Sequence, residues 1–150
     1  MSSKEKKKPT PIFVDGPISA EFIAALIAKH STKTNIGAHQ IFLGQIRIDE
    51  KNGKTVSAIE FSAYLEMAQE VYEAIREQIF SKYQLTCMHV HHSLGKINVG
   101  ELNLFVFTSS VHRKDAILAC SEMVELIKTQ LPIWGKEYLD GENYSWKENA

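Results

Sequence analysis

The chain has 150 residues, a formal net charge of −1, and a composition in which 44% of the residues are hydrophobic and 23% are charged. This length predicts a single domain with a real core. The near-neutral charge argues against nucleic acid or an anionic membrane as the partner of the whole surface, so any anion-binding site must be a local cluster of cations.

Residues 1–10, MSSKEKKKPT, hold four lysines and are followed by no apolar run, so they do not form a secretory signal peptide. We interpret them as a disordered, solubilising tail, and residues 11–150 as one domain. No stretch approaches the roughly 20 apolar residues of a membrane span. Cys87 and Cys120 lack CxxC spacing, which predicts neither a disulfide framework nor a zinc ribbon and favours a cytoplasmic protein.

The first predicted elements are a helix and two strands. Apolar residues at helical spacing follow Ser19, a plausible N-cap, through residue 30. Residues 38–48, AHQIFLGQIRI, predict a strand in which Gly44 marks a bulge or a close approach. A turn at Asn52-Gly53 then leads into a second strand.

The second half of the chain predicts two long helices separated by strands. In the helix over residues 65–83, we expect one apolar face formed by Met67, Val71, Ile75 and Ile79. Residues 86–101 contain a strand and a turn, and residues 101–110 form an apolar run typical of a strand buried on both faces. A last helix over residues 112–130 precedes a polar tail, and its predicted inner stripe is Ala116, Cys120, Met123, Ile127 and Leu131.

This order predicts an α+β fold, a mainly antiparallel sheet with helices packed on it. Four groups of residues could carry chemistry. His112, Arg113 and Lys114 stand together where the last helix begins. Because a helix N-terminus already favours anions, three cationic side chains there suggest a negative ligand. A solvated basic turn remains an equal alternative.

Arg47, at the predicted end of a strand, could grip a phosphate or carboxylate, although a surface arginine is the commoner reading. His89 and His91 share a strand face, but no acidic or cysteine ligand follows at a zinc-like spacing. We therefore expect no metal, and we interpret His92 as a sheet-edge residue with a packing role.

Lys128 lies near the end of the last helix, where the helix dipole alone explains a cation. A continuous helix separates it from His112 by roughly 24 Å at about 1.5 Å per residue. One small-molecule site in one chain cannot easily use both ends. Either the two basic groups serve different sites or a second copy brings them together, which predicts a symmetric homodimer.

Several motifs occur together in one order: FLGQIR (42–47), HSLGKINVGE (92–101), SSVHRKDA (109–116) and KTQLPIWGKE (128–137). In combination they resemble the large, catalytic subunit of molybdopterin synthase, a MoaE-like family, over about residues 12 to 148. The resemblance implies a fold of the α/β-hammerhead type and a sulfurtransferase that needs no cofactor. Its substrate is cyclic pyranopterin monophosphate, and the product is the molybdopterin dithiolene.

The resemblance also implies the partners. Sulfur arrives on the C-terminal Gly-Gly thiocarboxylate of a small ubiquitin-like subunit, and the assembly is a heterotetramer built on a dimer of the large subunit. Neither cysteine of this chain has a context that suggests an activated sulfur carrier, which agrees with sulfur arriving on a partner. No nucleic acid, membrane or metal is implied.

Residue roles follow position by position. The resemblance implies that His112, Arg113 and Arg47 bind the substrate phosphate and pterin edge, and that Phe42 lines the pocket near the incoming tail. Lys128 is placed beside the thiocarboxylate, for proton transfer or for stabilising an oxyanion.

The sequence departs from the family at Gly135, where a lysine is usual, and at Ser93, where an arginine is usual. Lys136 is then the candidate to supply the missing ammonium from the next position. The alternative function is a homologue that docks the small subunit without efficient sulfur transfer.

Overall fold

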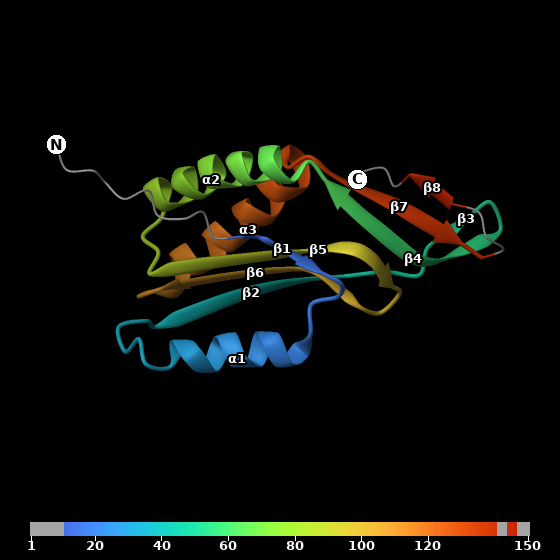
Figure 1. Ribbon diagram of the computed structural model, residues 1–150. Coiled ribbons are helices and arrows are strands. Elements are labelled where there is room, and N and C mark those ends of the chain that lie inside the picture. Colours follow the sequence, from blue (N-terminus) through green and yellow to red (C-terminus); the bar gives the residue numbers. More distant parts are fainter. Residues whose placement is uncertain (1–10, 141–143, 147–150) are drawn as a thin grey trace.

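The computed structural model describes residues 11–140 and 144–146. The lysine-rich residues 1–10, which we interpreted as a disordered tail, lie outside the described residues. Figure 1 shows a long sheet with helices on both faces. The elements in chain order are β1 (Phe13–Asp15), α1 (Ala20–His30), β2 (Ala38–Gln45), β3 (Glu50–Lys51), β4 (Lys54–Ala63), α2 (Leu65–Lys82), β5 (Cys87–Asn98), β6 (Leu102–Ser110), α3 (Arg113–Gln130), β7 (Ile133–Leu139) and β8 (Tyr144–Trp146).

The sheet follows the order β2-β6-β5-β4-β7-β8, with β1 added to β5 and β3 added to β4. All the described strand pairs are antiparallel except β1 with β5. The predicted α+β class with a mainly antiparallel sheet and packed helices is therefore confirmed. The strand predicted to be buried on both faces is β6, which lies between β2 and β5 and is buried from Asn103 to Ser110.

Strand β5 belongs to two parts of the sheet. Its first half, Cys87 to His92, pairs with β6, whereas Gly95 to Asn98 pair with β4. Gly95 has φ +88°, a left-handed conformation that glycine adopts without a steric penalty. The strand bends near this residue, and β4, β7 and β8 extend away from the helical part of the molecule (Figure 1).

Helices cover the two faces of the first part differently. On one face α1 packs through Ile23 and Leu26 against Phe105 and Phe107 of β6. On the other face α2 and α3 pack on the alternate residues Leu104 and Val106. Successive strand residues point to opposite faces, so β6 supplies apolar side chains to both layers.

Local predictions for the helices and the turn largely agree with the structure. Ser19 caps α1 by accepting a hydrogen bond from the amide of Phe22 at 3.1 Å. Asn52 and Gly53 have φ +52° and +75°, as a tight hairpin turn requires. The whole predicted inner stripe of α3 is buried: Ala116, Cys120, Met123, Ile127 and Leu131.

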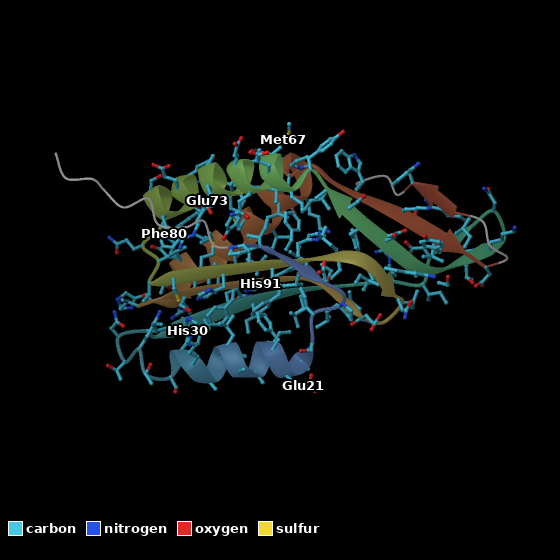
Figure 2. The ribbon with its side chains drawn as sticks, viewed as in Figure 1. Glu21, His30, Met67, Glu73, Phe80 and His91 are labelled. Carbon is cyan, nitrogen blue, oxygen red and sulfur yellow. The ribbon has the colours of Figure 1, made fainter. Side chains whose placement is uncertain are left out.

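Three details of the prediction were wrong. Met67 is 54% exposed and points away from the sheet (Figure 2), because α2 buries Ala68 and Tyr72 in its place. Strand β2 ends at Gln45, after a register shift at Gly44/Gln45, so Arg47 lies beyond the strand. The segment after α3 is no tail, because residues 133–139 form β7, which pairs with β4.

The bend at Gly95 generates a stability prediction. A Cβ added there meets nothing within 4 Å, so Gly95→Ala adds no clash and tests the backbone alone. We expect a loss of about 1–2 kcal/mol in the free energy of unfolding, measured by urea denaturation, because an L-residue is strained in this conformation. Gly95→Asn is the matched control, since asparagine tolerates the left-handed region better. Equal stability of Gly95→Ala and the parent chain would contradict a strained bend.

Candidate functional site

A pocket of about 290 Å³ lies where the two parts of the sheet separate. Its walls come from the end of β2, from β4, β5 and β6, from the last turn of α3 and from the start of β7. The lining residues are Phe42, Leu43, Gly44, Gln45, Ile46, Phe61, His92, Asn103, Ile127, Lys128, Leu131, Ile133, Trp134 and Gly135. The strands that line the pocket belong to the two parts of the sheet that β5 joins, so the pocket depends on the bend of β5.

Lys128 supplies the one permanently charged side chain among these lining residues, and none of them is acidic. It lies in the last turn of α3, one residue after Ile127, which is buried in the core. An ammonium in a partly enclosed pocket without acidic lining side chains favours an anionic ligand, because enclosure reduces solvent screening. The pocket is therefore suited to a carboxylate, a thiocarboxylate or a similar small anion.

His92 is a pocket residue that the sequence alone did not reveal. Its side chain is 3% exposed, and its Nδ1 lies 2.8 Å from the carbonyl oxygen of Ser93, so this nitrogen carries the proton and donates. Burial, together with a smaller effect of the nearby charge of Lys128, lowers the pKa of His92 to about 4. The imidazole is neutral near pH 7 and leaves Lys128 as the cation.

Phe42 and Gly44 shape the wall formed by β2. Phe42 lines the pocket, and its predicted place beside the incoming tail stays a prediction. A Cβ on Gly44 would lie 3.0 Å from Oδ1 of Asn103 and 3.2 Å from Cβ of Leu104, which confirms the predicted close approach. The absence of a side chain at Gly44 keeps this wall close to β6.

Strand β7 places Gly135 and Lys136 on opposite faces of the sheet. Gly135 pairs with Phe61 on the pocket face, whereas Lys136 pairs with Glu60. The Lys136 ammonium lies 5.3 Å from the ring centre of Tyr138, whose hydroxyl donates to Glu60 at 2.6 Å. Because the side-chain period of a strand is two residues, Lys136 does not reach the place of a side chain at position 135.

Ser93, the other departure from the family pattern, is fully buried, and its hydroxyl oxygen has no hydrogen-bond partner among the described residues. It follows His92 in β5, and so faces the side of the sheet opposite to His92. Neither Ser93 nor Lys136 is among the lining residues of this pocket.

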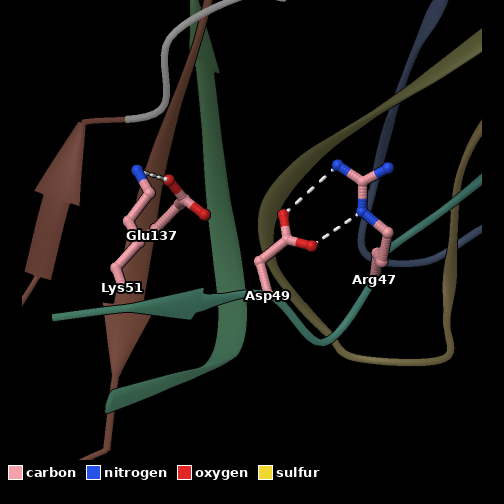
Figure 3. Close-up of polar contacts among 4 residues, drawn as sticks. All are labelled: Arg47, Asp49, Lys51 and Glu137. Atoms are coloured by element: carbon pink, nitrogen blue, oxygen red, sulfur yellow. Dashed lines mark hydrogen bonds and ion pairs between the residues drawn. The ribbon is translucent and has the colours of Figure 1, made fainter. Parts of the chain in front are cut away.

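Arg47 lies outside the pocket, in the connection between β2 and β3. Its side chain is 76% exposed and donates to both carboxylate oxygens of Asp49, at 2.7 and 3.3 Å (Figure 3). The same figure shows Lys51 of β3 bonded to the buried carboxylate of Glu137 in β7 at 2.5 Å. The guanidinium is thus on the surface, where a ligand has to compete with Asp49.

His112 and Arg113 lie at the opposite end of α3 from Lys128. Both side chains are exposed, and His112 is the N-cap residue, with extended backbone geometry. The helix runs unbroken from Arg113 to Gln130, so about 22 Å separates Arg113 from Lys128 at about 1.5 Å per residue. One chain therefore brings Phe42 and Lys128 together and leaves His112, Arg113 and Arg47 outside their pocket.

Cys120 is not suited to carry sulfur. It is buried on the inner stripe of α3, and burial raises the pKa of its thiol to about 11. The thiolate is the nucleophilic form of cysteine, so Cys120 is inert near neutral pH. This agrees with the expectation that sulfur arrives on another molecule.

The fold and the pocket define a small α+β protein with a cavity that is lined by one lysine and no acidic side chain, of the kind that receives an anionic group. A family model described as MoaE protein matches residues 14–130. The chain therefore belongs to the MoaE family, as the motifs indicated.

Relatives and solved structures agree with this assignment. The molybdopterin synthase catalytic subunit of Pyrococcus abyssi is 35% identical over 124 residues, which cover 83% of this chain and 80% of that protein. The protein of the same name from Drosophila melanogaster is 36% identical over 138 residues, which cover 91% of this chain but 36% of that longer protein.

Among solved structures, molybdopterin synthase from Staphylococcus aureus is 28% identical, with a TM-score of 0.78 over 91% of this chain and 95% of that one. A chain from a complex of subunits 1 and 2 of the molybdopterin-converting factor of Helicobacter pylori has the same fold, with a TM-score of 0.77 over 91% of this chain and 88% of that one, at 18% identity. Among the described residues, no helix is both long and apolar enough to span a membrane.

His92 generates a pH prediction. Its pKa is about 4 in the folded chain and about 6.5 in the unfolded chain, so the unfolded state binds the proton more tightly. Its contribution to stability is present above pH 6.5 and is lost as the pH falls toward 4, by about 3 kcal/mol in total. Between pH 6.5 and pH 4, the free energy of unfolding should fall by about 3 kcal/mol more in the parent chain than in His92→Gln, which lacks the imidazole. Urea denaturation of both proteins across this pH range measures the difference. Parallel pH profiles for the two proteins would contradict a neutral, buried His92.

Proposed function

We propose that this chain is the catalytic subunit of a molybdopterin synthase, a sulfurtransferase of the cytoplasm. It converts cyclic pyranopterin monophosphate into molybdopterin, with sulfur delivered as the C-terminal thiocarboxylate of a small ubiquitin-like subunit. The observation that carries the proposal is the placement of Lys128, in a chain of the MoaE family, as the one lysine or arginine lining a pocket that has no acidic side chain. Relatives named catalytic subunits support it.

The pocket suits the end of a Gly-Gly tail. Its volume of about 290 Å³ is at the lower limit for ligand sites, which are about 300–1,000 Å³. A terminal Gly-Gly has no side chains and fits so narrow a space. The negative end of such a tail is favoured beside the ammonium of Lys128.

Lys128 then acts on the thiocarboxylate. The sulfur first bonds to the pterin while it is still joined to the acyl carbon of the tail. Water then adds to that carbon and negative charge builds on the acyl oxygen, after which the carbon–sulfur bond breaks, the sulfur stays on the pterin and the tail leaves as a carboxylate. A fixed ammonium in a partly enclosed cavity stabilises the charge on the acyl oxygen more than water does. The neutral His92 in the same wall does not compete for the anion, and Phe42 covers the tail with an apolar surface.

The substrate phosphate is bound by a second copy of the chain. His112 and Arg113 of one copy approach the Lys128 pocket of the other, and Arg47 completes the anion site. The exposure of three apolar side chains beside the basic cluster supports such an interface: Val111, Ile117 and Leu118. A symmetric dimer makes two equivalent sites, each shared between copies.

Nothing in the described part of the chain favours the docking-only alternative. Gly135 removes an ammonium from the pocket wall, and Lys136 on the opposite face does not replace it, but Lys128 remains in place. We assign Lys128 the catalytic role, and Lys136, the second candidate from the sequence, is tested beside it.

The first functional prediction compares these two lysines. In a reconstitution with thiocarboxylated small subunit and pterin precursor, we expect Lys128→Ala to lower the rate of molybdopterin formation by about 100-fold or more, because a preorganised charge is lost. Lys136→Ala, which removes an ammonium from the opposite face, is the matched control and should stay within about twofold. Both variants should bind the small subunit with nearly unchanged affinity.

Equal losses in the two variants would contradict the assignment of Lys128 alone. No product above background with the parent chain, despite normal complex formation, would establish the docking-only function.

The second functional prediction tests the shared site. Lys128→Ala and Arg113→Ala chains should each be inactive alone, but a mixture allowed to exchange subunits should regain about a quarter of the parent activity, since half of the dimers then hold one intact site. Light scattering should give the mass of a dimer for the large subunit alone. A monomer, or a mixture as inactive as its components, would overturn the shared site while leaving the role of Lys128 open to the first experiment.

A further inference from the structure

A second cluster of chemically active side chains lies on the face of the sheet that α1 covers. Nε2 or Nδ1 of His30 and His89 and Sγ of Cys87 all lie within 4.8 Å of one another. Cys87 and His89 are two residues apart in β5 and share a face, whereas His30 is the last residue of α1. Sequence spacing could not reveal the third member, because it comes from a different element 57 residues before Cys87.

The donor atom of His30 is already oriented toward this cluster. Its Nδ1 lies 2.7 Å from the carbonyl oxygen of Leu26, so Nδ1 carries the proton and donates to that oxygen. Nε2 is then unprotonated in the neutral ring, and it lies 3.1 Å from Nε2 of His89. Metal-binding histidines are commonly held in this way, with the second ring nitrogen bonded to a backbone carbonyl.

The site is also sheltered. His30 is 4% exposed, and the ring of Phe107 lies 4.9 Å from the rings of both His30 and His39. His39 is turned away, because its Nδ1 contacts the hydroxyl of Ser109 at 2.6 Å. Three donors therefore converge from two elements, and an apolar shell surrounds them.

We propose that His30, Cys87 and His89 bind a zinc ion. Two neutral imidazoles and a thiolate form a mixed nitrogen–sulfur set that suits Zn²⁺. Tetrahedral zinc with bonds of about 2.0–2.1 Å to nitrogen and about 2.3 Å to sulfur places its ligand atoms about 3.3–3.6 Å apart. The separations in the cluster, from 3.1 Å to at most 4.8 Å, reach this geometry with small side-chain rotations. The fourth position is left for a water molecule.

Such an ion would join the end of α1 to the start of β5. It lies on the opposite face of the sheet from Lys128, since Cys87 packs in the layer of α1, whereas Phe42 and Ile127 belong to the layer of α2 and α3. The proposed zinc therefore lies apart from Lys128 and does not take part in sulfur transfer. The competing explanation is a simple hydrogen bond in which His89 donates to His30.

The experiment uses the full chain, freed of any affinity tag and stripped of metal with a chelator. On titration with Zn²⁺ we expect one ion per chain and a rise of several degrees in the melting temperature, because binding stabilises only the folded state. Cobalt as a substitute should give the absorption of thiolate-to-metal charge transfer. Cys87→Ser and His89→Gln should each weaken zinc binding by more than about 100-fold.

His91→Gln is the matched control. His91 lies two residues after His89 on the same strand face, but its ring packs against Phe22 and Phe105 outside the cluster (Figure 2). This variant should bind zinc as the parent chain does. If Cys87→Ser or His89→Gln does not fold, the cobalt spectrum of the parent chain decides by itself. Folded parent chain without cobalt–thiolate absorption, or zinc binding that survives both substitutions, would overturn the proposal and leave the hydrogen-bonded pair.

Discussion

The backbone pairing of β5 is the constraint on which the rest of the structure depends. One strand donates and accepts hydrogen bonds along β6 in its first half and along β4 in its second half. The change of partner requires the bend near Gly95, and the two parts of the sheet separate there. Since every wall of the pocket is attached to one of these two parts, the pocket exists because a single strand serves both.

Helix α3 holds the candidate cationic residues at its two opposite ends. Its C-terminal turn carries Lys128 to the pocket wall, and its N-terminus holds His112 and Arg113 on the surface about 22 Å away. The rigid spacing makes a complete anion site within one chain impossible for these residues. A shared site in a dimer resolves the separation without any change in the helix, and this is the physical basis of the proposed assembly.

The two faces of the sheet provide separate chemical environments. Toward α2 and α3, the thiol of Cys120 is buried and kept protonated, which leaves sulfur chemistry to a molecule that enters the pocket. Toward α1, His30, Cys87 and His89 form a polar cluster within an apolar layer. The alternation of strand side chains keeps the two apart, so the proposed metal site on one face does not contact the Lys128 pocket on the other.

The sequence by itself determined the helices, the buried strand β6, the turn at Asn52-Gly53 and the family, because these depend on local periodicity, turn chemistry and contiguous motifs. It also identified Lys128 and Phe42, which the structure brings into one pocket. Strand β7 was missed, since Pro132, Gly135 and Lys136 weaken its pattern and only pairing with β4 makes it a strand.

Tertiary structure alone decided the surroundings of each candidate. It placed His92 in the pocket wall, turned Lys136 to the opposite face, left Arg47 on the surface with Asp49, and brought His30 to Cys87 and His89. These are contacts between residues far apart in the chain or differences between the two faces of a strand. They depend on the register and the bend of the sheet, which local sequence does not encode.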